Sequence, residues 1–159
     1  MNLLHHHVGL SVADLDRAKK WYADVLGLTE GFAFEIAPLR VRGCFLEGHG
    51  TRVELLERAG SGGGIGGQDP PRALLTRGYG HIAFATPDLD ATFADLVARG
   101  AIPVWDPRPS PEPGVRMAFV ADLDGNLVEF IEIPVADGPV AGVPVAEGPV
   151  AEGTVGEGR

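Results

Sequence analysis

Residues 81–90 read HIAFATPDLD, and residues 7–16 read HVGLSVADLD. Both stretches begin with a histidine, alternate apolar and small residues, and end on the same Asp-Leu-Asp tripeptide. The alternation predicts a strand, and an aspartate followed by apolar residues at helical spacing predicts the start of a helix. We therefore expect two copies of one structural unit.

A helix is expected after each of these strands. Asp14 and Asp88 are the predicted N-caps, and Gly27 and Gly100 are the predicted stops. The apolar residues between them recur at helical spacing: Leu15, Ala18, Tyr22, Val25 and Leu26 in the first half, and Leu89, Phe93, Leu96 and Val97 in the second.

Strand-like runs broken by glycine and proline follow each helix. They are APLRVRGCFLEG (37–48) and TRVELLE (51–57) in the first half, and PVW (103–105), VRMAFVAD (115–122) and NLVEFIE (126–132) in the second. Each half reads as a strand, a helix and about three strands, which predicts an α+β fold of two βαβββ modules. One such module cannot cover both faces of its sheet, so two must pair, within the chain or between chains.

The expected domain boundaries follow changes in composition. The first module spans 1–60, a glycine-rich linker spans 61–75, and the second module spans 76–134. The linker contains SGGGIGG, which lacks the Lys-Ser/Thr of a phosphate-binding loop. Residues 135–159 repeat proline, valine, small and acidic residues with a five-residue period, which predicts a disordered acidic tail.

Composition argues against several classes of protein. The net charge is −9 and Lys and Arg are not clustered, which argues against a nucleic-acid partner. The apolar stretches are far shorter than the roughly 20 residues that cross a bilayer. Cys44 is the only cysteine, so neither an internal disulfide nor a thiolate metal cluster is possible. We expect no membrane partner and a cytoplasmic location.

The two halves also align at a histidine and at a glutamate. His7 and His81 are 74 residues apart, and Glu54 and Glu129 are 75 apart. The other two histidines of the HHH tract have no counterpart in the second half, so His7 is the preferred candidate of the three. Matched positions in a repeat make these four residues the candidates for a common site.

Strand alternation places these residues beside small neighbours. His7 shares its face with Gly9 and Ser11, and His81 shares its face with two alanines, which predicts an open cavity. A carboxylate in the middle of an apolar strand is costly to bury unless a partner balances it. Two imidazoles and two carboxylates at one cavity predict one divalent metal, and Zn, Ni, Co, Mn and Fe all suit such mixed nitrogen and oxygen ligands.

Three segments resemble the vicinal oxygen chelate superfamily, which includes glyoxalase I, methylmalonyl-CoA epimerase, extradiol dioxygenases, and bleomycin- and fosfomycin-resistance proteins. They are HVGLSVADLDRAKKWYADVLGL (7–28), GYGHIAFATPDLD (78–90) and DLDGNLVEFIE (122–132), and the resemblance covers residues 4–134. It implies two βαβββ modules that form a cup-shaped, partly closed mixed sheet with the helices outside. It also implies a metal in the cup, a site often completed across a homodimer, and the ligands His7, Glu54, His81 and Glu129.

Such a metal with two carboxylates predicts proton transfer. Chelation of two adjacent substrate oxygens acidifies the C–H beside a carbonyl and stabilises the resulting enediolate. Glu54 and Glu129 are the candidate bases. The expected function is a lyase or isomerase acting on a small hydroxy-carbonyl or 2-oxo substrate. An Fe(II) extradiol-type dioxygenase, which the resemblance implies would need only His7, His81 and Glu129, is the alternative, and a small-molecule-binding antibiotic-resistance protein is the second alternative.

Substrate contacts are predicted at a few further positions. Arg116, on a predicted strand, is the candidate for gripping a carboxylate or phosphate. Trp105, together with Tyr79 and Phe45, could form an apolar wall, and Ser11 belongs to the floor of small residues.

Overall fold

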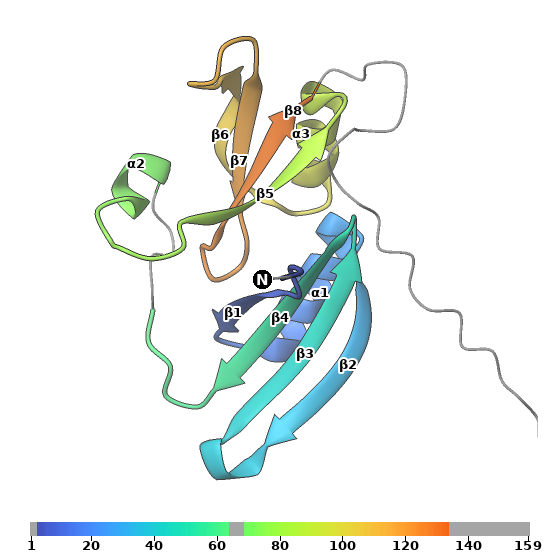
Figure 1. Ribbon diagram of the computed structural model, residues 1–159, viewed down its shortest axis with the longest axis vertical. Helices are drawn as coiled ribbons and strands as arrows, with labels where there is room; N and C mark the ends of the chain where they lie inside the picture. The colour runs from blue at the N-terminus through green and yellow to red at the C-terminus, as the bar shows by residue number, and fades with distance from the viewer. Residues whose placement is uncertain (1–2, 64–68, 134–159) are drawn as a thin grey trace, which may run out of the picture.

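The computed structural model describes residues 3–63 and 69–133, which form two βαβββ modules and confirm the predicted α+β fold (Figure 1). The first module contains β1 (Val8–Val12), α1 (Leu15–Leu26), β2 (Thr29–Ile36), the 3-10 turn η1 (Ala37–Leu39), β3 (Val41–Gly48) and β4 (Thr51–Arg58). The second contains β5 (His81–Thr86), α3 (Leu89–Ala98), β6 (Ile102–Pro109), β7 (Arg116–Ala121) and β8 (Leu127–Glu132). A short helix, α2 (Pro70–Ala73), lies in the segment expected to be a linker. The predicted tail, 135–159, lies outside the described residues.

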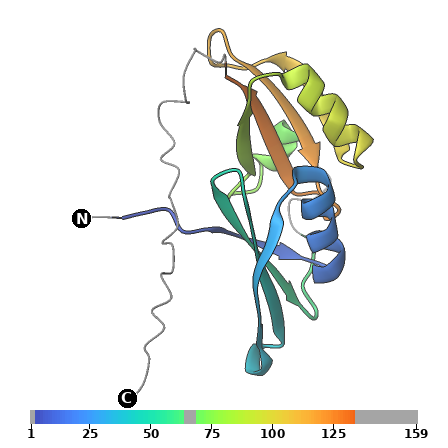
Figure 2. The same cartoon turned by 90° about the vertical axis from the view of Figure 1, so that its right-hand side faces the viewer.

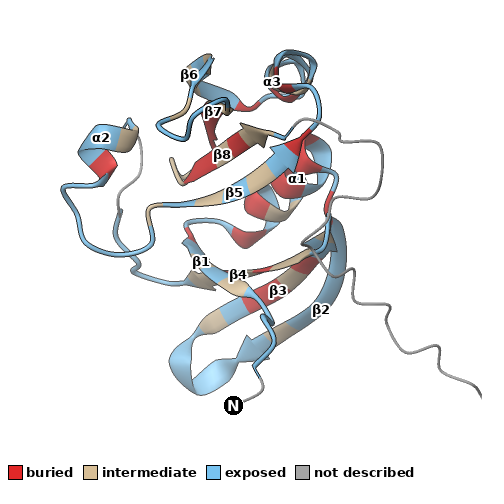
Figure 3. Cartoon of the chain, turned by 45° about the horizontal axis from the view of Figure 1, so that its top comes forward, coloured by how far each residue is buried: buried red, intermediate tan, exposed pale blue. Residues whose placement is uncertain are grey.

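Each module has one four-stranded mixed sheet. The strand orders are β1-β4-β3-β2 and β5-β8-β7-β6, so the first strand of each module pairs with the last. That pairing is parallel and the other pairings are antiparallel. The edge strand β2 was not among the predicted runs of the first half. Figure 3 shows that β2 is exposed along nearly its whole length, although Phe32, Phe34 and Ile36 alternate along it with period two.

Both predicted helix starts are confirmed. The Asp14 carboxylate accepts a hydrogen bond from the backbone N–H of Arg17 at 3.0 Å, and Asp88 accepts one from Ala91 at 2.9 Å. Each aspartate satisfies a first-turn N–H that has no partner within the helix. α1 ends at Gly27, whose φ of 68° is a conformation that glycine adopts without steric cost.

The repeated Asp-Leu-Asp tripeptide also supplies an ion pair in each module. Arg42 on β3 bonds Asp16 at 2.9 Å, and Arg116 on β7 bonds Asp90 at 2.8 and 2.9 Å. Hydrogen bonds from these guanidinium groups lower the pKa of Asp16 and of Asp90. The second aspartate of each tripeptide therefore ties the start of its helix to the neighbouring sheet.

A glutamate at the end of each sheet completes this arrangement. Glu57 on β4 accepts from the N–H of Leu15 at 2.7 Å, and Glu132 on β8 accepts from the N–H of Leu89 at 3.1 Å. A carboxylate at a helix N-terminus is favoured by the helix dipole. The leucine of each tripeptide thus has a defined backbone partner as well as a buried side chain.

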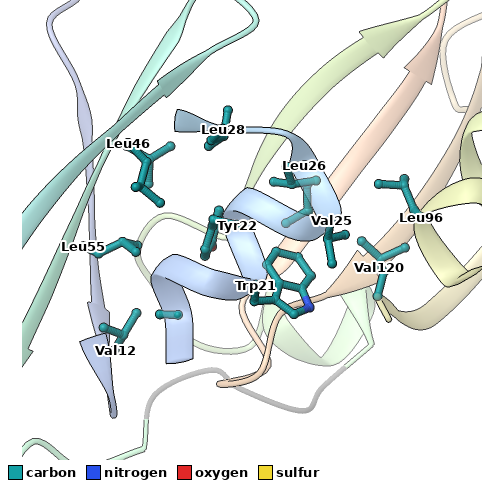
Figure 4. Packing of buried hydrophobic residues seen from close by; sticks show 14 of the residues in the cluster. Val12, Trp21, Tyr22, Val25, Leu26, Leu28, Leu46, Leu55, Leu96 and Val120 are labelled. Carbon is teal, nitrogen blue, oxygen red and sulfur yellow. The ribbon is translucent and has the colours of Figure 1, made fainter. Parts of the chain in front are cut away.

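Helix α1 packs against both modules. α1 and α3 lie on the same side of the two sheets (Figure 2). Figure 4 shows Val25 and Trp21 of α1 beside Leu96 and Val120 of the second module, and all four belong to one hydrophobic core. The Trp21 indole also donates to the carbonyl of Gly100 at 3.4 Å. The pairing of modules that the sequence requires is therefore made partly through a helix, and no helix of the described residues is long and apolar enough to cross a membrane.

A buried hydrogen bond joins the modules across 100 residues of sequence. The Tyr22 hydroxyl on α1 donates to the Asp122 carboxylate at 3.0 Å, and both residues are buried. Burial, reinforced by the negative charge of Asp122, raises the pKa of Tyr22 well above its usual range. Asp122 also accepts from the N–H groups of Asp124 and Asn126, which holds the turn before β8.

Exchange of Tyr22 for phenylalanine is expected to lower the free energy of unfolding by about 1–3 kcal/mol, because a buried carboxylate loses one donor. Urea denaturation followed by circular dichroism, at one fixed protein concentration, measures the change. Tyr79→Phe is the matched control, because Tyr79 is 95% exposed and its hydroxyl faces water. Equal stability of Tyr22→Phe and Tyr79→Phe would show that the hydrogen bond adds nothing.

Candidate functional site

The first predicted His and Glu lie together on the open face of the first sheet. β1 and β4 run parallel with Gly9 beside Glu54, which brings His7, two residues before Gly9, close to that carboxylate. His7 Nε2 lies 3.4 Å from Glu54 Oε2. A side chain at position 9 would begin 3.4 Å from the same oxygen, so Gly9 leaves the carboxylate open. We refer to His7 and Glu54 as the first pair.

The second module repeats this arrangement. β5 and β8 run parallel with Ala83 beside Glu129. His81 Nε2 lies 3.0 Å from Glu129 Oε2. The small Ala83 takes the place of Gly9, so both carboxylates have a small neighbour on the adjoining strand. We refer to His81 and Glu129 as the second pair.

The donor atoms of each pair fit a divalent metal. Ligands that bind a metal at about 2.1 Å and at right angles to each other lie about 3 Å apart, and the two N–O distances are 3.4 and 3.0 Å. Imidazole nitrogen with carboxylate oxygen is the mixed donor set that first-row metals accept. The side chains of Glu54 and Glu129 are only 18% and 13% exposed, so a nearby cation would offset the cost of burying them.

The two pairs do not form one cluster within the chain. Among residues 3–63 and 69–133, no group of three or more His, Cys, Asp or Glu side chains is arranged to hold a metal. Protein metal sites of this kind normally use at least three protein ligands. Within the described residues, the four predicted ligands therefore lie in two separate pairs.

A cavity of about 410 Å³ separates the modules. It is lined by β1, by the start of β5 and by the turn at 124–127. Ser11, predicted to contact substrate, lies on its wall, as does His81. Neither Glu54 nor Glu129 lines the cavity. The cavity therefore touches the second pair only at His81.

Aromatic rings adjoin the second pair. Phe119 on β7 stands opposite Glu129 on β8, and its ring meets the His81 ring edge to face at 5.4 Å. Trp105 on β6 contacts Phe119 in turn at 5.7 Å. Trp105, predicted as an apolar wall, therefore lies one ring away from the second pair. Phe119 was not predicted as a site residue. The repeat indicated it, since Phe119 is the counterpart of Phe45 in the first module.

Phe45 stands in the same relation to the first pair. It faces Glu54 across β3 and β4, and its ring meets that of His7 at 5.3 Å. The Arg52 guanidinium lies over Phe45 at 4.0 Å and donates to His6 Nε2 at 2.9 Å. His6 Nδ1 is 2.6 Å from His7 Nδ1, so the HHH tract contributes a neighbour of the preferred ligand.

Arg116 lies away from the two pairs. It stands opposite Glu132 on β8, three residues beyond Glu129, so strand alternation directs it to the other face of the sheet. There its guanidinium bonds Asp90 and Glu132. An arginine that completes an internal ion pair has few donors left for a ligand, so we do not include Arg116 in the proposed site.

A family model described as Glyoxalase/Bleomycin resistance protein/Dioxygenase superfamily matches residues 5–130. The chain is 30% identical over 130 residues to a probable lactoylglutathione lyase of Vibrio cholerae, covering 79% of this chain and 88% of the relative. It is 32% identical over 130 residues to a lactoylglutathione lyase of Haemophilus influenzae, covering 79% and 90%.

A solved structure, glyoxalase I from Zea mays, is similar at 25% identity with a TM-score of 0.64. The match covers 80% of this chain and 44% of the maize chain, so the present chain spans less than half of that protein.

Proposed function

Since the chain belongs to the Glyoxalase/Bleomycin resistance protein/Dioxygenase superfamily, we propose that it is a metal-dependent enzyme of the glyoxalase type. Its substrate is a small hydroxy-carbonyl or 2-oxo compound with two adjacent oxygens, and its reaction is proton transfer, as a lyase or an isomerase. The observation that carries this proposal is the repeated His–Glu pair, with N–O distances of 3.4 and 3.0 Å on the open faces of the two sheets. The relatives named as lactoylglutathione lyases support lyase chemistry.

His7, Glu54, His81 and Glu129 would hold the metal. When bound, the metal supplies a Lewis acid that polarises the substrate carbonyl. The proton transfer itself is carried out by the Glu54 or Glu129 carboxylate. Both are largely covered, which removes competing water, and either can accept the proton from the substrate carbon at a carboxylate oxygen.

We propose that a homodimer completes the site. In this arrangement the first pair of one protomer meets the second pair of its partner, and the dimer contains two equivalent sites. Two features support it: each chain presents two incomplete half-sites within its described residues, and Phe32, on the edge strand of the first sheet, is 65% exposed. Large exposed aromatic side chains are typical of surfaces that pair with another protein.

Exchange of a substrate hydrogen with solvent, measured under anaerobic conditions, tests the proposed proton transfer. A hydroxy-ketone, or the hemithioacetal that a 2-oxoaldehyde forms with an added thiol, is incubated with the metal-loaded protein in heavy water under anaerobic conditions, and deuterium at the hydroxyl-bearing carbon beside the carbonyl is measured by NMR. Uptake above the protein-free rate is expected. Oxygen consumption with a catechol, in the absence of exchange, would instead support the dioxygenase alternative.

Metal content tests the ligand assignment separately. The wild-type protein is expected to retain about one divalent ion per chain after dialysis, and His81→Ala is expected to retain almost none, because a direct metal ligand is lost. Inductively coupled plasma mass spectrometry measures both. His5→Ala is the control, since His5 is exposed and has no counterpart in the second module. Equal metal in wild type and His81→Ala would refute the assignment.

A further inference from the structure

The edge strands of the two modules carry different side chains at equivalent positions. Gly43 on β3 and Met117 on β7 are equivalent, because each lies two residues before the phenylalanine that faces the ligand glutamate. Phe34 on β2 pairs with Gly43, and Arg108 on β6 pairs with Met117. An apolar ring in the first module is therefore replaced by a cation in the second.

The first module presents an apolar shelf. Phe32 and Phe34 stack at 6.1 Å, and Phe34 contacts Phe45 at 5.8 Å. The outer atoms of the Phe34 ring occupy the space that a side chain at Gly43 would need, which places the ring against the open face of the sheet. Because Phe45 touches His7, this shelf is continuous with the first pair.

In the second module an irregularity in β6 brings Arg108 to the open face. Trp105 pairs with Phe119 and Arg108 pairs with Met117, so three residues of β6 span two of β7. Without this extra residue, side chains three apart would point to opposite faces. The Arg108 guanidinium instead lies over the Trp105 ring at 4.7 Å. Contacts thus run from His81 through Phe119 and Trp105 to Arg108.

Arg108 is held in place yet keeps donors available. Its Nε donates to the carbonyl of Asp106 at 3.0 Å, and stacking on Trp105 restrains the guanidinium plane. The strand arginines Arg42 and Arg116 each pair with a carboxylate. In the described part of the chain no carboxylate pairs with Arg108, which is exposed, and two aromatic rings, Trp105 and Phe119, lie between it and His81.

We propose that Arg108 binds a carboxylate of the substrate, while Phe32 and Phe34 hold an apolar group. This inference deepens the proposed function and rests on it, since each cup of the proposed dimer joins one first module to one second module. Arg108 is on β6, two strands away from Glu129 on β8. This spacing places the carboxylate of the substrate roughly 10 Å from the two substrate oxygens that bind the metal. One guanidinium balances one carboxylate in charge and in planar shape. The predicted substrate class is an apolar, preferably aromatic, hydroxy-carbonyl or 2-oxo compound with a distal carboxylate.

Two non-reacting probes test this without measuring turnover. Benzohydroxamate and 4-(2-carboxyethyl)benzohydroxamate offer a metal the same two adjacent oxygens, and the second adds a carboxylate on a two-carbon arm that is long enough to reach the distance given by the strand spacing. Isothermal titration calorimetry on the metal-loaded wild type is expected to give tighter binding of the carboxylated probe. Arg108→Met is expected to raise the Kd of that probe by about 10- to 100-fold, as expected for loss of a charge-assisted hydrogen bond, and to leave the Kd of benzohydroxamate unchanged.

The control is Arg17→Met, which removes the same charge from the exposed surface of α1. Circular dichroism spectra identical to wild type verify that both variants fold. If Arg108→Met weakens both probes equally, or Arg17→Met has the same effect as Arg108→Met, the carboxylate assignment is wrong although the metal site stands. If wild type binds neither probe, the proposed function fails and this inference fails with it.

Discussion

Mixing two inactive variants is expected to restore about one quarter of the wild-type activity, if each site joins half-sites from two protomers. One variant carries His7→Ala with Glu54→Ala and lacks the first pair. The other carries His81→Ala with Glu129→Ala and lacks the second pair. Random exchange of protomers places one variant of each kind in about half of the dimers, and in such a dimer one of the two cups receives two intact half-sites.

The measurement is activity after partial denaturation and refolding of the mixed variants. Each variant treated alone is the control and should stay inactive, because every cup of its homodimers lacks one pair. A site built within a single chain would give no recovery, since each chain would carry one broken pair. The restored activity therefore reports where the two pairs meet, which metal analysis of either variant does not.

Glu54→Gln is expected to keep most of the metal and to lose turnover by about 10²-fold or more if Glu54 is the base. The amide oxygen still coordinates, but an amide cannot accept the substrate proton at neutral pH. Deuterium uptake under anaerobic conditions measures the proton transfer, and metal analysis of the same sample shows whether the ligand set is intact. Unchanged uptake with full metal content would remove Glu54 from the acid–base role.

Glu129→Gln is the matched variant. The two carboxylates have similar exposure, 18% and 13%, and similar distances to a histidine, so burial alone does not distinguish their roles. Deuterium exchange should be lost when the carboxylate that acts as the base becomes an amide, and the same change at the other carboxylate should leave most of the exchange and most of the metal. In the dioxygenase alternative, Glu54→Gln should leave oxygen-dependent activity intact.

Local patterns predicted the modules well. The helix starts at Asp14 and Asp88 depend on a side chain and an N–H three residues ahead, so the sequence contains both partners. The βαβββ order follows from periodicity, and duplication doubles each signal. β2 was not predicted, although Phe32, Phe34 and Ile36 alternate along it as in a strand; the two phenylalanines stack on each other.

For the candidate site, the two His–Glu pairs could be predicted from the sequence, and the positions of the arginines could not. The pairing of His7 with Glu54, and of His81 with Glu129, agrees with the alignment of the two halves, because the parallel strand register is repeated in both modules. Arg116 was placed in the pocket from its residue type, whereas its position along β7 puts it on the helix face. Arg108 was not predicted. Regular alternation from Trp105 would point it to the other face, and only the irregular pairing of β6 with β7 reverses that.

Features that depend on spacing along the chain could be predicted: two modules, their helix caps, and a histidine and glutamate at matched places in each. How those modules meet could not, because it depends on contacts between side chains far apart in sequence. Trp21 and Tyr22 of α1 reach Gly100 and Asp122 of the second module. This packing buries one side of both sheets in a shared core and leaves the two His–Glu pairs apart, because one helix face can bury apolar area against two sheets without closing them around a common centre.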